Sequence, residues 1–389
     1  MNSHLQFSKT LTKTLVFAAL TFFTLQSSTF ADDFDDATAD PFNDDYMGES
    51  VSTIEELMDR YHKYDQFNGA VLVVKDGDVV FKRGYGWANR EWKIENTPDT
   101  KFRIASVTKQ FTAMLVMQLV QAGKIRLDAP ISTYLPDYRK DTGKQVTIHH
   151  LLSHTSGIPN YTRLSNYRSK ISLQHHNVDE FSQTYCSGEL EFTTGSKYSY
   201  SNSGYYLLSN IIEKVTGQSF AQALTSQITE PLGMKDTGFE QPQAIMAKRA
   251  SGYQQIFSGY ANSSPIDMST VMGAGSMVST VEDLVLWDEA LYGTDLLTQK
   301  HKDRMFRENM DGYGYGWGIK TLTVGNRQVK TVRHLGGING FASSITRMVD
   351  DKHMVVLLNN TDNADLGGIN ANIINILYDQ PYTMPKRLP

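Results

Sequence analysis

Strand hairpins at both ends of the chain constrain its fold more than any other feature of the sequence. Residues 69–89 (GAVLVVKDGDVVFKRGYGWAN) contain two β-rich runs around Asp76-Gly77, a pair that tolerates the positive φ of a tight hairpin turn. Residues 342–360 (ASSITRMVDDKHMVVLLNN) repeat the design, with two strand-like runs joined at Asp350-Asp351. Hairpins at the two ends of one chain commonly share a single antiparallel sheet. The sequence therefore predicts a sheet to which both ends contribute.

Helical patterns accompany this sheet. Residues 51–64 have helical spacing, with one apolar stripe formed by Ile54, Leu57, Met58 and Tyr61. A second helical pattern runs from about 366 to 378, and the long middle, roughly 105–300, is mostly helical in pattern between Gly, Pro and Ser loops. The predicted fold class is α+β: an antiparallel sheet flanked by terminal helices, with an inserted, mainly helical lobe.

The charge balance argues against a nucleic-acid partner. The chain of 389 residues carries 37 Lys and Arg against 42 Asp and Glu, a formal net charge of −5. Binding to a phosphate backbone requires a basic face, and the sequence shows none. We expect a small-molecule or peptide substrate, and nothing in the sequence indicates an oligomeric state.

The first 31 residues have the pattern of a secretory signal peptide. Lys9 and Lys13 precede an apolar run of eleven residues at 15–25, and Thr29-Phe30-Ala31 offers small residues at the cleavage site. Eleven apolar residues are too few to cross a bilayer core of about 30 Å. We therefore expect cleavage after Ala31, export to the periplasm or the medium of a bacterium, and no integral membrane segment in the mature chain.

An acidic linker and one large domain follow the signal peptide. Residues 32–50 contain seven Asp without apolar periodicity, a composition typical of a disordered linker. Residues 51–380 form one large predicted domain. Cys186 is the only cysteine, so the chain cannot form an internal disulfide, and its neighbours supply no base that would make it a nucleophile.

The first candidate for chemistry is the S-x-x-K pattern of Ser106 and Lys109. Residues 105–122 are predicted to be helical, which places the lysine on the same face as the serine. Burial among Phe111, Met114 and Leu115 would lower the pKa of the amine, and a neutral amine can accept the serine proton. The Ser106 N–H at the helix N-terminus is a natural oxyanion donor. Taken alone, the pattern equally fits an N-cap serine followed by an exposed lysine.

A second candidate is Tyr200-Ser201-Asn202, just before another helical pattern. The pKa of tyrosine is about 10, so a basic phenolate needs a neighbouring cation, and Lys109 is a candidate. Asn202 can donate to a substrate carbonyl and accept from Lys109. An N-cap cluster beside core tyrosines is the alternative interpretation.

A third candidate is the glycine-rich segment 332–340 (VRHLGGING). Glycines allow a backbone to approach a ligand closely, and an N–H in this segment can complete an oxyanion hole. We expect His334 to add positive charge near the site. A turn between strands with a surface histidine is the alternative.

The three motifs occur in a characteristic order: S-x-x-K, then Y-S-N roughly 90 residues later, then H-L-G about 130 residues after that. This order resembles the serine β-lactamase and penicillin-binding-protein superfamily, particularly its class C β-lactamase and D-alanyl-D-alanine peptidase branch. Four phrases strengthen the likeness, which extends over roughly 52–378: 151–157 (LLSHTSG), 231–234 (PLGM), 275–280 (GSMVST) and 315–317 (YGW).

The resemblance implies a role for each motif. Ser106 would be the nucleophile, Lys109 its activating partner, and Tyr200 the general base and later the general acid. Asn202 would orient the substrate beside the strand motif of His334, Leu335 and Gly336, and the N–H groups of Ser106 and Gly337 would form the oxyanion hole. The family fold has the same sheet and helical lobe, with the site between them.

One departure from the family pattern bears on the substrate. The middle residue of the third motif is Ser or Thr in many β-lactamases and D-alanyl peptidases, where its hydroxyl helps to hold a substrate carboxylate. Leu335 has no group that can do so. This favours relatives that act on esters, amides or D-amino-acid peptides, with Arg333 as another candidate for a carboxylate partner.

Other function classes fit less well. His149-His150, His154 and His175-His176 lack the carboxylate spacing of a metal site, so no metal and no cofactor are expected, and His154 fits a hydrogen-bonded structural residue. The G-x-S-x-G elbow, the P-loop and the dinucleotide fingerprint are absent from the sequence. A non-catalytic cell-envelope binding or sensor protein on the same scaffold is the main alternative, and a metal-dependent hydrolase is a weaker one.

Overall fold

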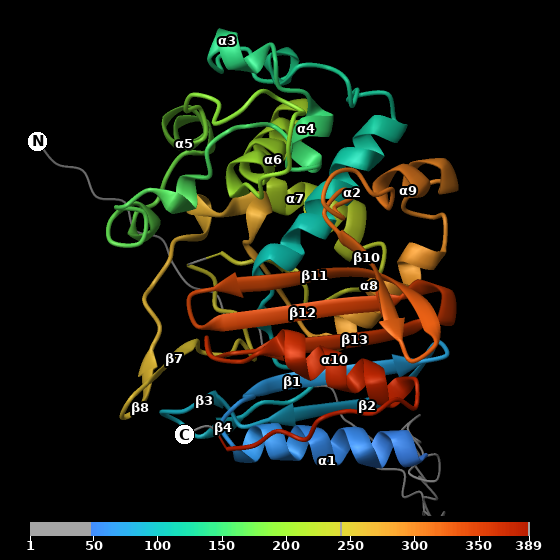
Figure 1. Ribbon diagram of the computed structural model, residues 1–389. Coiled ribbons are helices and arrows are strands. Elements are labelled where there is room, and N and C mark those ends of the chain that lie inside the picture. The colour runs from blue at the N-terminus through green and yellow to red at the C-terminus, as the bar shows by residue number, and fades with distance from the viewer. Residues whose placement is uncertain (1–47, 242, 388–389) are drawn as a thin grey trace, which may run out of the picture. The chain divides into compact units, whose positions relative to one another are not determined.

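A computed structural model of the protein describes residues 48–387 except 242, so the predicted signal peptide and nearly all of the acidic linker lie outside the described residues. Its main element is a six-stranded antiparallel sheet in the order β10-β11-β12-β13-β1-β2 (Figure 1). The strands are β1 (Gly69–Lys75), β2 (Asp78–Tyr85), β10 (Gly318–Val324), β11 (Arg327–Ile338), β12 (Phe341–Met348) and β13 (His353–Asn359).

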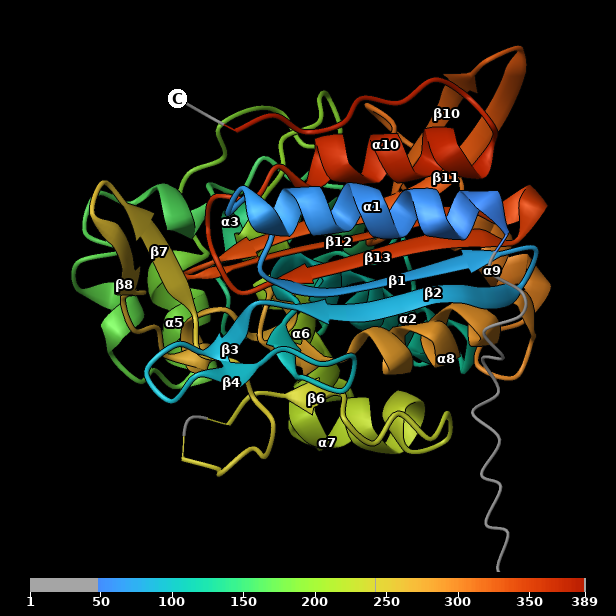
Figure 2. The same cartoon turned by 90° about the horizontal axis from the view of Figure 1, so that it is seen from below.

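The two ends of the domain meet where β1 pairs with β13, in a register that joins Gly69 to Asn359. Both strands are almost wholly buried, with Leu72 facing one apolar cluster and Val73 the other. Burial on both faces explains why these strands are continuous apolar runs. Figure 2 shows α1 (Glu49–Lys63) and α10 (Leu366–Leu377) covering one face of the sheet. The predicted fold class is therefore confirmed.

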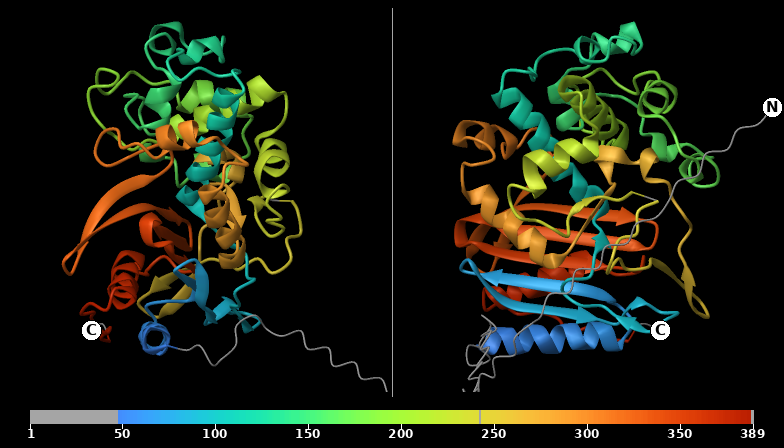
Figure 3. Two further views of the ribbon diagram at one scale, coloured as in Figure 1. Left: turned by 90° about the vertical axis from the view of Figure 1, so that its right-hand side faces the viewer. Right: turned by 180° about the vertical axis from the view of Figure 1, so that it is seen from behind.

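The middle of the chain forms a helical lobe beyond β11 (Figure 3). Its helices, with those that connect it to the sheet, are α2 (Thr108–Gln121), α3 (Lys140–Gly143), α4 (Ile148–Leu152), α5 (Val178–Tyr185), α6 (Asn202–Thr216), α7 (Phe220–Leu224), α8 (Val281–Tyr292) and α9 (Gln299–Met305). Short strands precede this region or interrupt it: β3 (Trp87–Asn89) pairs with β4 (Ile94–Glu95), β9 (Met277–Ser279) pairs with β5 (Phe102–Arg103) and β6 (Gly238–Phe239), and β7 (Tyr253–Ile256) pairs with β8 (Gly259–Asn262). The helical pattern of the middle did not predict β6, β7, β8 and β9.

Helix α2 links the sheet side to the lobe. Its first ten residues are all buried, which is unusual for an amphipathic helix and typical of one surrounded by other elements. Phe111 stacks on Trp287 of α8 with ring centroids 4.2 Å apart. A polar residue near the start of such a helix is carried into the interior, and this is where Lys109 lies.

Candidate active site

Ser106 lies in a 3₁₀ turn, Ala105–Val107, which leads directly into α2. Ala105 has a φ of 47°, in the left-handed region that non-glycine residues rarely adopt. Such strain persists only where the surroundings hold it in place, and it is frequent at functional sites. The turn leaves Ser106 partly exposed, at the wall of two cavities.

The amine of Lys109 is fully buried and has three close oxygen neighbours. Its Nζ lies 3.1 Å from the Ser106 Oγ, 2.8 Å from the Asn202 Oδ1 and 2.7 Å from the carbonyl oxygen of Ala274. No carboxylate is among these partners, and burial lowers the pKa of Lys109 well below its usual value. A neutral amine donates twice, so it can satisfy the two acceptor-only oxygens and direct its lone pair at the Ser106 hydroxyl.

Tyr200 lies beside this pair, half-buried at the wall of one cavity. The Lys109 Nζ lies 4.8 Å from the centre of its ring. Burial raises the pKa of the Tyr200 hydroxyl, and a side-chain hydrogen bond with Ser106 only partly opposes this. The expected phenolate is therefore disfavoured in this structure. The expectation assumed a charged Lys109, whereas burial favours the neutral amine.

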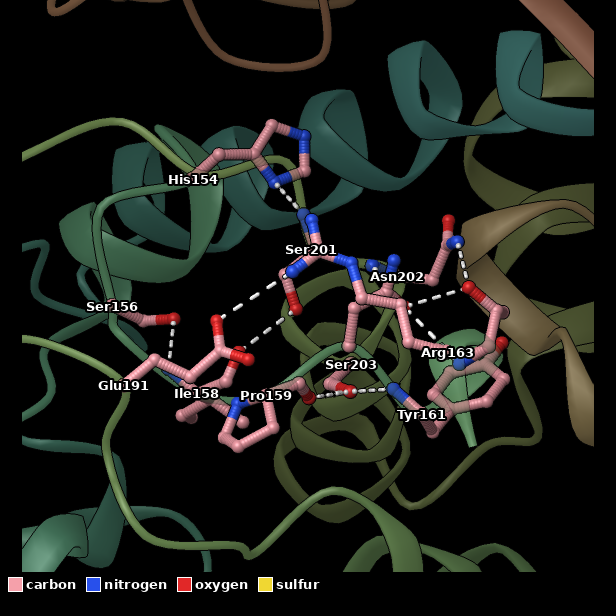
Figure 4. Close-up of polar contacts among 12 residues, drawn as sticks. His154, Ser156, Ile158, Pro159, Tyr161, Arg163, Glu191, Ser201, Asn202 and Ser203 are labelled. Atoms are coloured by element: carbon pink, nitrogen blue, oxygen red, sulfur yellow. Dashed lines mark hydrogen bonds and ion pairs between the residues drawn. The ribbon is translucent and has the colours of Figure 1, made fainter. Parts of the chain in front are cut away.

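Asn202 is the first residue of α6 and lies beside the segment that follows α4 (Figure 4). Its side-chain oxygen accepts from Lys109, as expected, while its Nδ2 donates to the Thr162 Oγ1 at 3.4 Å. Its own N–H donates to the Asn160 Oδ1 at 3.3 Å. These bonds connect the start of α6 to the loop after α4, and they fix the amide beside the Lys109 amine.

His334 lies within β11, buried, and has both ring nitrogens engaged. Its Nδ1 is 2.6 Å from the Leu335 carbonyl oxygen, which can only accept, so the ring proton is on Nδ1. Its Nε2 then accepts from the Tyr313 hydroxyl at 2.9 Å. Burial, and secondarily the nearby Lys109, lower the pKa of His334 to about 3. The expectation that His334 adds positive charge is wrong, because the neutral ring is locked by Tyr313.

The glycines of β11 allow the strand to lie against the Ser106 turn. A Cβ on Gly336 would be 2.2 Å from the Ser343 Oγ and 2.4 Å from the Ile104 carbonyl oxygen. The same Ser343 hydroxyl donates to that carbonyl at 2.7 Å. Gly337 meets no such obstacle and lines both cavities at Ser106. The segment 336–337 is thus part of a strand in contact with the Ser106 turn and not a free turn between strands.

Two cavities adjoin Ser106, one on each side. The first, of about 410 Å³, is lined by Asn202, Tyr161, Arg168, Ile338 and neighbouring residues. The second, of about 580 Å³, is lined by Tyr198, Tyr200, Tyr313, Arg333 and the 334–337 segment. Leu335 is 53% exposed there. A substrate can therefore extend in both directions from the Ser106 hydroxyl.

The sequence-predicted residues gather at this place, and others do not. Ser106, Lys109, Tyr200 and Asn202 are connected by the contacts above, with His334, Gly336 and Gly337 on the facing strand. Cys186 is buried in the lobe, and burial raises the pKa of its thiol. Within the described part of the chain, no group of three His, Cys, Asp or Glu residues is arranged to hold a metal ion.

Two partners were missed by sequence reasoning. The Ala274 carbonyl binds Lys109 through the backbone, so no residue type signals it. Tyr313 binds His334 from the loop before β10. The neighbouring phrase at 315–317 was noticed in the sequence, but its spacing did not point to a partner for His334.

A serine in the turn before a helix and a buried lysine in the first turn of that helix lie at the junction of an antiparallel sheet and a helical lobe. This arrangement defines the class of serine hydrolases to which this enzyme belongs. The chain is a member of the β-lactamase family, whose model matches residues 51–377. The predicted superfamily and enzyme class are thereby confirmed.

Known proteins of this kind are similar over most of their length. Penicillin-binding protein 4* of Bacillus subtilis is 29% identical over 87% of this chain and 77% of its own. The structure of D-amino acid amidase from Ochrobactrum anthropi SV3, complexed with L-phenylalanine amide, matches with a TM-score of 0.72 and 26% identity, over 85% of this chain and 98% of the amidase. A penicillin-binding protein from Bacillus halodurans matches with a TM-score of 0.70 and 27% identity, over 83% and 97% of the two chains.

The described helices, within residues 48–387, are too short or too polar to span a membrane.

Proposed function

We propose that this protein is an exported serine hydrolase that cleaves an amide or ester through an acyl-enzyme on Ser106. One observation carries the proposal: the Lys109 Nζ lies 3.1 Å from the Ser106 Oγ, and its other two close partners can only accept hydrogen bonds. A lysine in this position is a base for the serine, because burial keeps it neutral and its lone pair has one available target.

Acylation follows from this geometry. The Ser106 Oγ forms a bond to the substrate carbonyl carbon while its proton passes to the Lys109 Nζ. The resulting oxyanion is held by the N–H groups of Ser106 and Gly337. When the bond to the leaving group breaks, the Tyr200 hydroxyl donates a proton to that group and regains one from Lys109. The raised pKa of Tyr200 suits a proton donor.

Deacylation reuses the same groups. Water attacks the ester carbon and gives a proton to Lys109. When the bond between that carbon and the Ser106 Oγ breaks, Lys109 returns a proton to the Oγ, which restores the serine hydroxyl and the neutral amine. Asn202 is placed to orient the acyl group, since its Oδ1 is engaged by Lys109 and the residue lines the 410 Å³ cavity together with Ile338 and Tyr161.

The strand motif of His334, Leu335 and Gly336 favours uncharged amide or ester substrates, including D-amino-acid derivatives. Its histidine is neutral and bound to Tyr313, and Leu335 has no hydroxyl. A β-lactam carboxylate would therefore lack the usual partners at these two positions. The similarity to a D-amino acid amidase from Ochrobactrum anthropi SV3 supports the same substrate class. Export to the periplasm or the medium is proposed from the pattern of residues 1–31.

The test is Ser106→Ala, compared with the parent on nitrocefin, short p-nitrophenyl esters and D-alanyl peptides. We expect the variant to fold and to lose turnover on whichever probe the parent cleaves. Incubation with a reactive phosphonate should add one adduct to the parent and none to Ser106→Ala, by intact mass. Parental turnover by the variant would refute the proposal, and a parent that neither turns over nor labels would favour the binding or sensor protein.

A further inference from the structure

Tyr200 is placed without the help of a regular element. It follows a long irregular segment after α5 and precedes the first residue of α6. A side chain on such a segment needs other contacts to hold it within a fraction of an ångström, and a catalytic site requires that accuracy. The question is which contacts fix the Tyr200 hydroxyl beside Ser106.

His154 contacts the backbone on both sides of Tyr200. The Ser199 N–H donates to the His154 carbonyl oxygen at 2.8 Å. The Ser201 N–H donates to the His154 Nδ1 at 3.2 Å (Figure 4). One residue thus accepts from the two amides that flank the tyrosine, one through its main chain and the other through its ring.

The histidine ring also packs on the tyrosine ring. The two centroids are 4.3 Å apart, and the His154 side chain belongs to a buried group of aromatic rings that includes Tyr205 and Tyr313. His154 is 1% exposed. Both the backbone and the ring of Tyr200 are therefore set by this histidine.

The conformation and protonation of His154 are specific to this arrangement. Its φ is 57°, a left-handed value that costs energy for a residue with a side chain, and this conformation brings its carbonyl and its ring to the same segment. Because Nδ1 accepts an amide proton, the ring proton is on Nε2, which has no partner among the described residues. Burial lowers the pKa of His154, so the acceptor is retained at neutral pH.

Other bonds in this loop hold the residues after Tyr200 and not Tyr200 itself. The Ser201 hydroxyl donates to the Ile158 carbonyl at 3.2 Å, and the Ser203 hydroxyl donates to the Pro159 carbonyl at 2.6 Å (Figure 4). These contacts anchor the start of α6. Only His154 among them reaches both flanks of the tyrosine.

We propose that His154 is a positioning residue, which holds the Tyr200 hydroxyl at Ser106 through the Ser199 and Ser201 amides without touching the substrate. The inference rests on the proposed function. Since displacement of a reacting group by about 1 Å can cost roughly 100-fold in rate, loss of the Nδ1 acceptor should lower kcat far more than it changes KM.

Two polar variants of similar size separate this role from simple packing. In His154→Asn the Oδ1 replaces the Nδ1 acceptor, and asparagine tolerates a left-handed φ. In His154→Gln the amide extends past that position. We expect His154→Asn to keep kcat within about 5-fold of the parent for an amide or alkyl ester substrate, whose leaving group must be protonated, and His154→Gln to lose about 10- to 100-fold with KM nearly unchanged.

His353→Gln is the matched control. His353 is also a buried histidine whose Nδ1 accepts a backbone N–H, from Asp76 at 3.0 Å, but it lies in β13 at the hairpin turn between β1 and β2. This variant should keep the parental kcat. Equal losses in His154→Gln and His353→Gln would overturn the proposal, as would a parental kcat in a folded His154→Gln.

An experiment on the parent protein does not depend on whether the variants fold. Nitrogen chemical shifts of histidine-labelled protein should show His154 protonated on Nε2 and not on Nδ1, and an Nδ1–H tautomer would overturn the proposal. The outcome is separable from the proposed function, because Ser106→Ala tests that function directly. A dead Ser106→Ala with a fully active His154→Gln would refute only the role of His154.

Discussion

The Lys109 Nζ lies 3.1 Å from the Ser106 Oγ and makes its other close contacts with oxygens that cannot donate. This arrangement determines the direction of proton transfer. A charged amine would donate to all three neighbours, whereas the neutral amine favoured by burial accepts from the one neighbour that has a proton to give. The pair is thus poised for attack before a substrate arrives.

Replacement of the amine by an apolar side chain of similar length tests this relationship. Lys109→Met removes the proton acceptor, and we expect kcat/KM to fall about 100- to 10,000-fold. The free energy of unfolding should change by less than about 2 kcal/mol, because burial of a polar amine is itself unfavourable. Both quantities are measured on the same preparation, by ester hydrolysis and by chemical denaturation.

Lys302→Met provides the control for this experiment. Lys302 is also buried, and its Nζ donates to the carbonyl oxygens of Leu291, Tyr292 and Gly293, outside the site. This variant should lose stability and keep turnover. If Lys109→Met retained parental activity, Lys109 would not be the base.

The pH profile should have one acid limb. Lys109 must be neutral to accept a proton, so kcat/KM should rise as the pH increases through the lowered pKa of this lysine and reach its plateau well below the usual pKa of an amine. Tyr200 should add no alkaline limb below about pH 10, since its pKa is raised and the donor form is retained.

The protonation of His334 should not affect the dependence of kcat/KM on pH. With a pKa lowered to about 3, His334 stays neutral through the physiological range. We expect His334→Gln to leave the midpoint of the acid limb in place when kcat/KM is measured from about pH 5 to about pH 10. A shift of the limb in this variant would contradict the assignment.

The sequence predicted what depends on local spacing. The hairpin at Asp76-Gly77 and the Ser106–Lys109 pair follow from turn chemistry and from the proximity of residues three apart on a helix. The Asn202–Lys109 contact joins residues 93 apart. The hydrogen-bonding groups of the two side chains suggested it, but residue spacing alone does not bring such distant positions together.

The remaining features of the site and the fold could be recognised only from the three-dimensional structure. The charge of His334 was misjudged because it depends on burial and on the Tyr313 hydroxyl, neither of which a motif encodes. Likewise, the short strands of the lobe, such as β5 and β9, pair over long separations and have too few residues for a periodic signal.

Because β11 lies close to the Ser106 turn, we expect alanine to have different effects at two adjacent glycines of this strand. Gly336→Ala forces a methyl group into the space of the Ser343 hydroxyl and the Ile104 carbonyl. We expect a loss of about 1–3 kcal/mol in the free energy of unfolding and a loss of about 10-fold or more in kcat/KM.

The adjacent Gly337→Ala is the control for stability, because nothing lies within 4 Å of the added Cβ. Its denaturation midpoint should match that of the parent. Equal stability of the two alanine variants would show that the close approach at Gly336 is not required.

The charge of Arg333 leads us to expect a preference for substrates with a negatively charged leaving group. Among the described residues that line the 580 Å³ cavity beside Tyr198 and Leu335, Arg333 is the only one that carries charge at neutral pH, and it has no ion-pair partner. Because a charged hydrogen bond contributes about 1.5–3 kcal/mol, Arg333→Gln should lower kcat/KM about 10- to 100-fold for a substrate whose leaving group bears a carboxylate. When the carboxylate of that leaving group is converted to an uncharged amide, Arg333→Gln and the parent should cleave the substrate with the same kcat/KM. Lys320→Gln, which alters a neighbouring cavity and not this one, should leave both substrates unaffected. The prediction is wrong if Arg333→Gln lowers the two rates by the same factor, since the arginine would then act through the shape of the cavity and not through its charge.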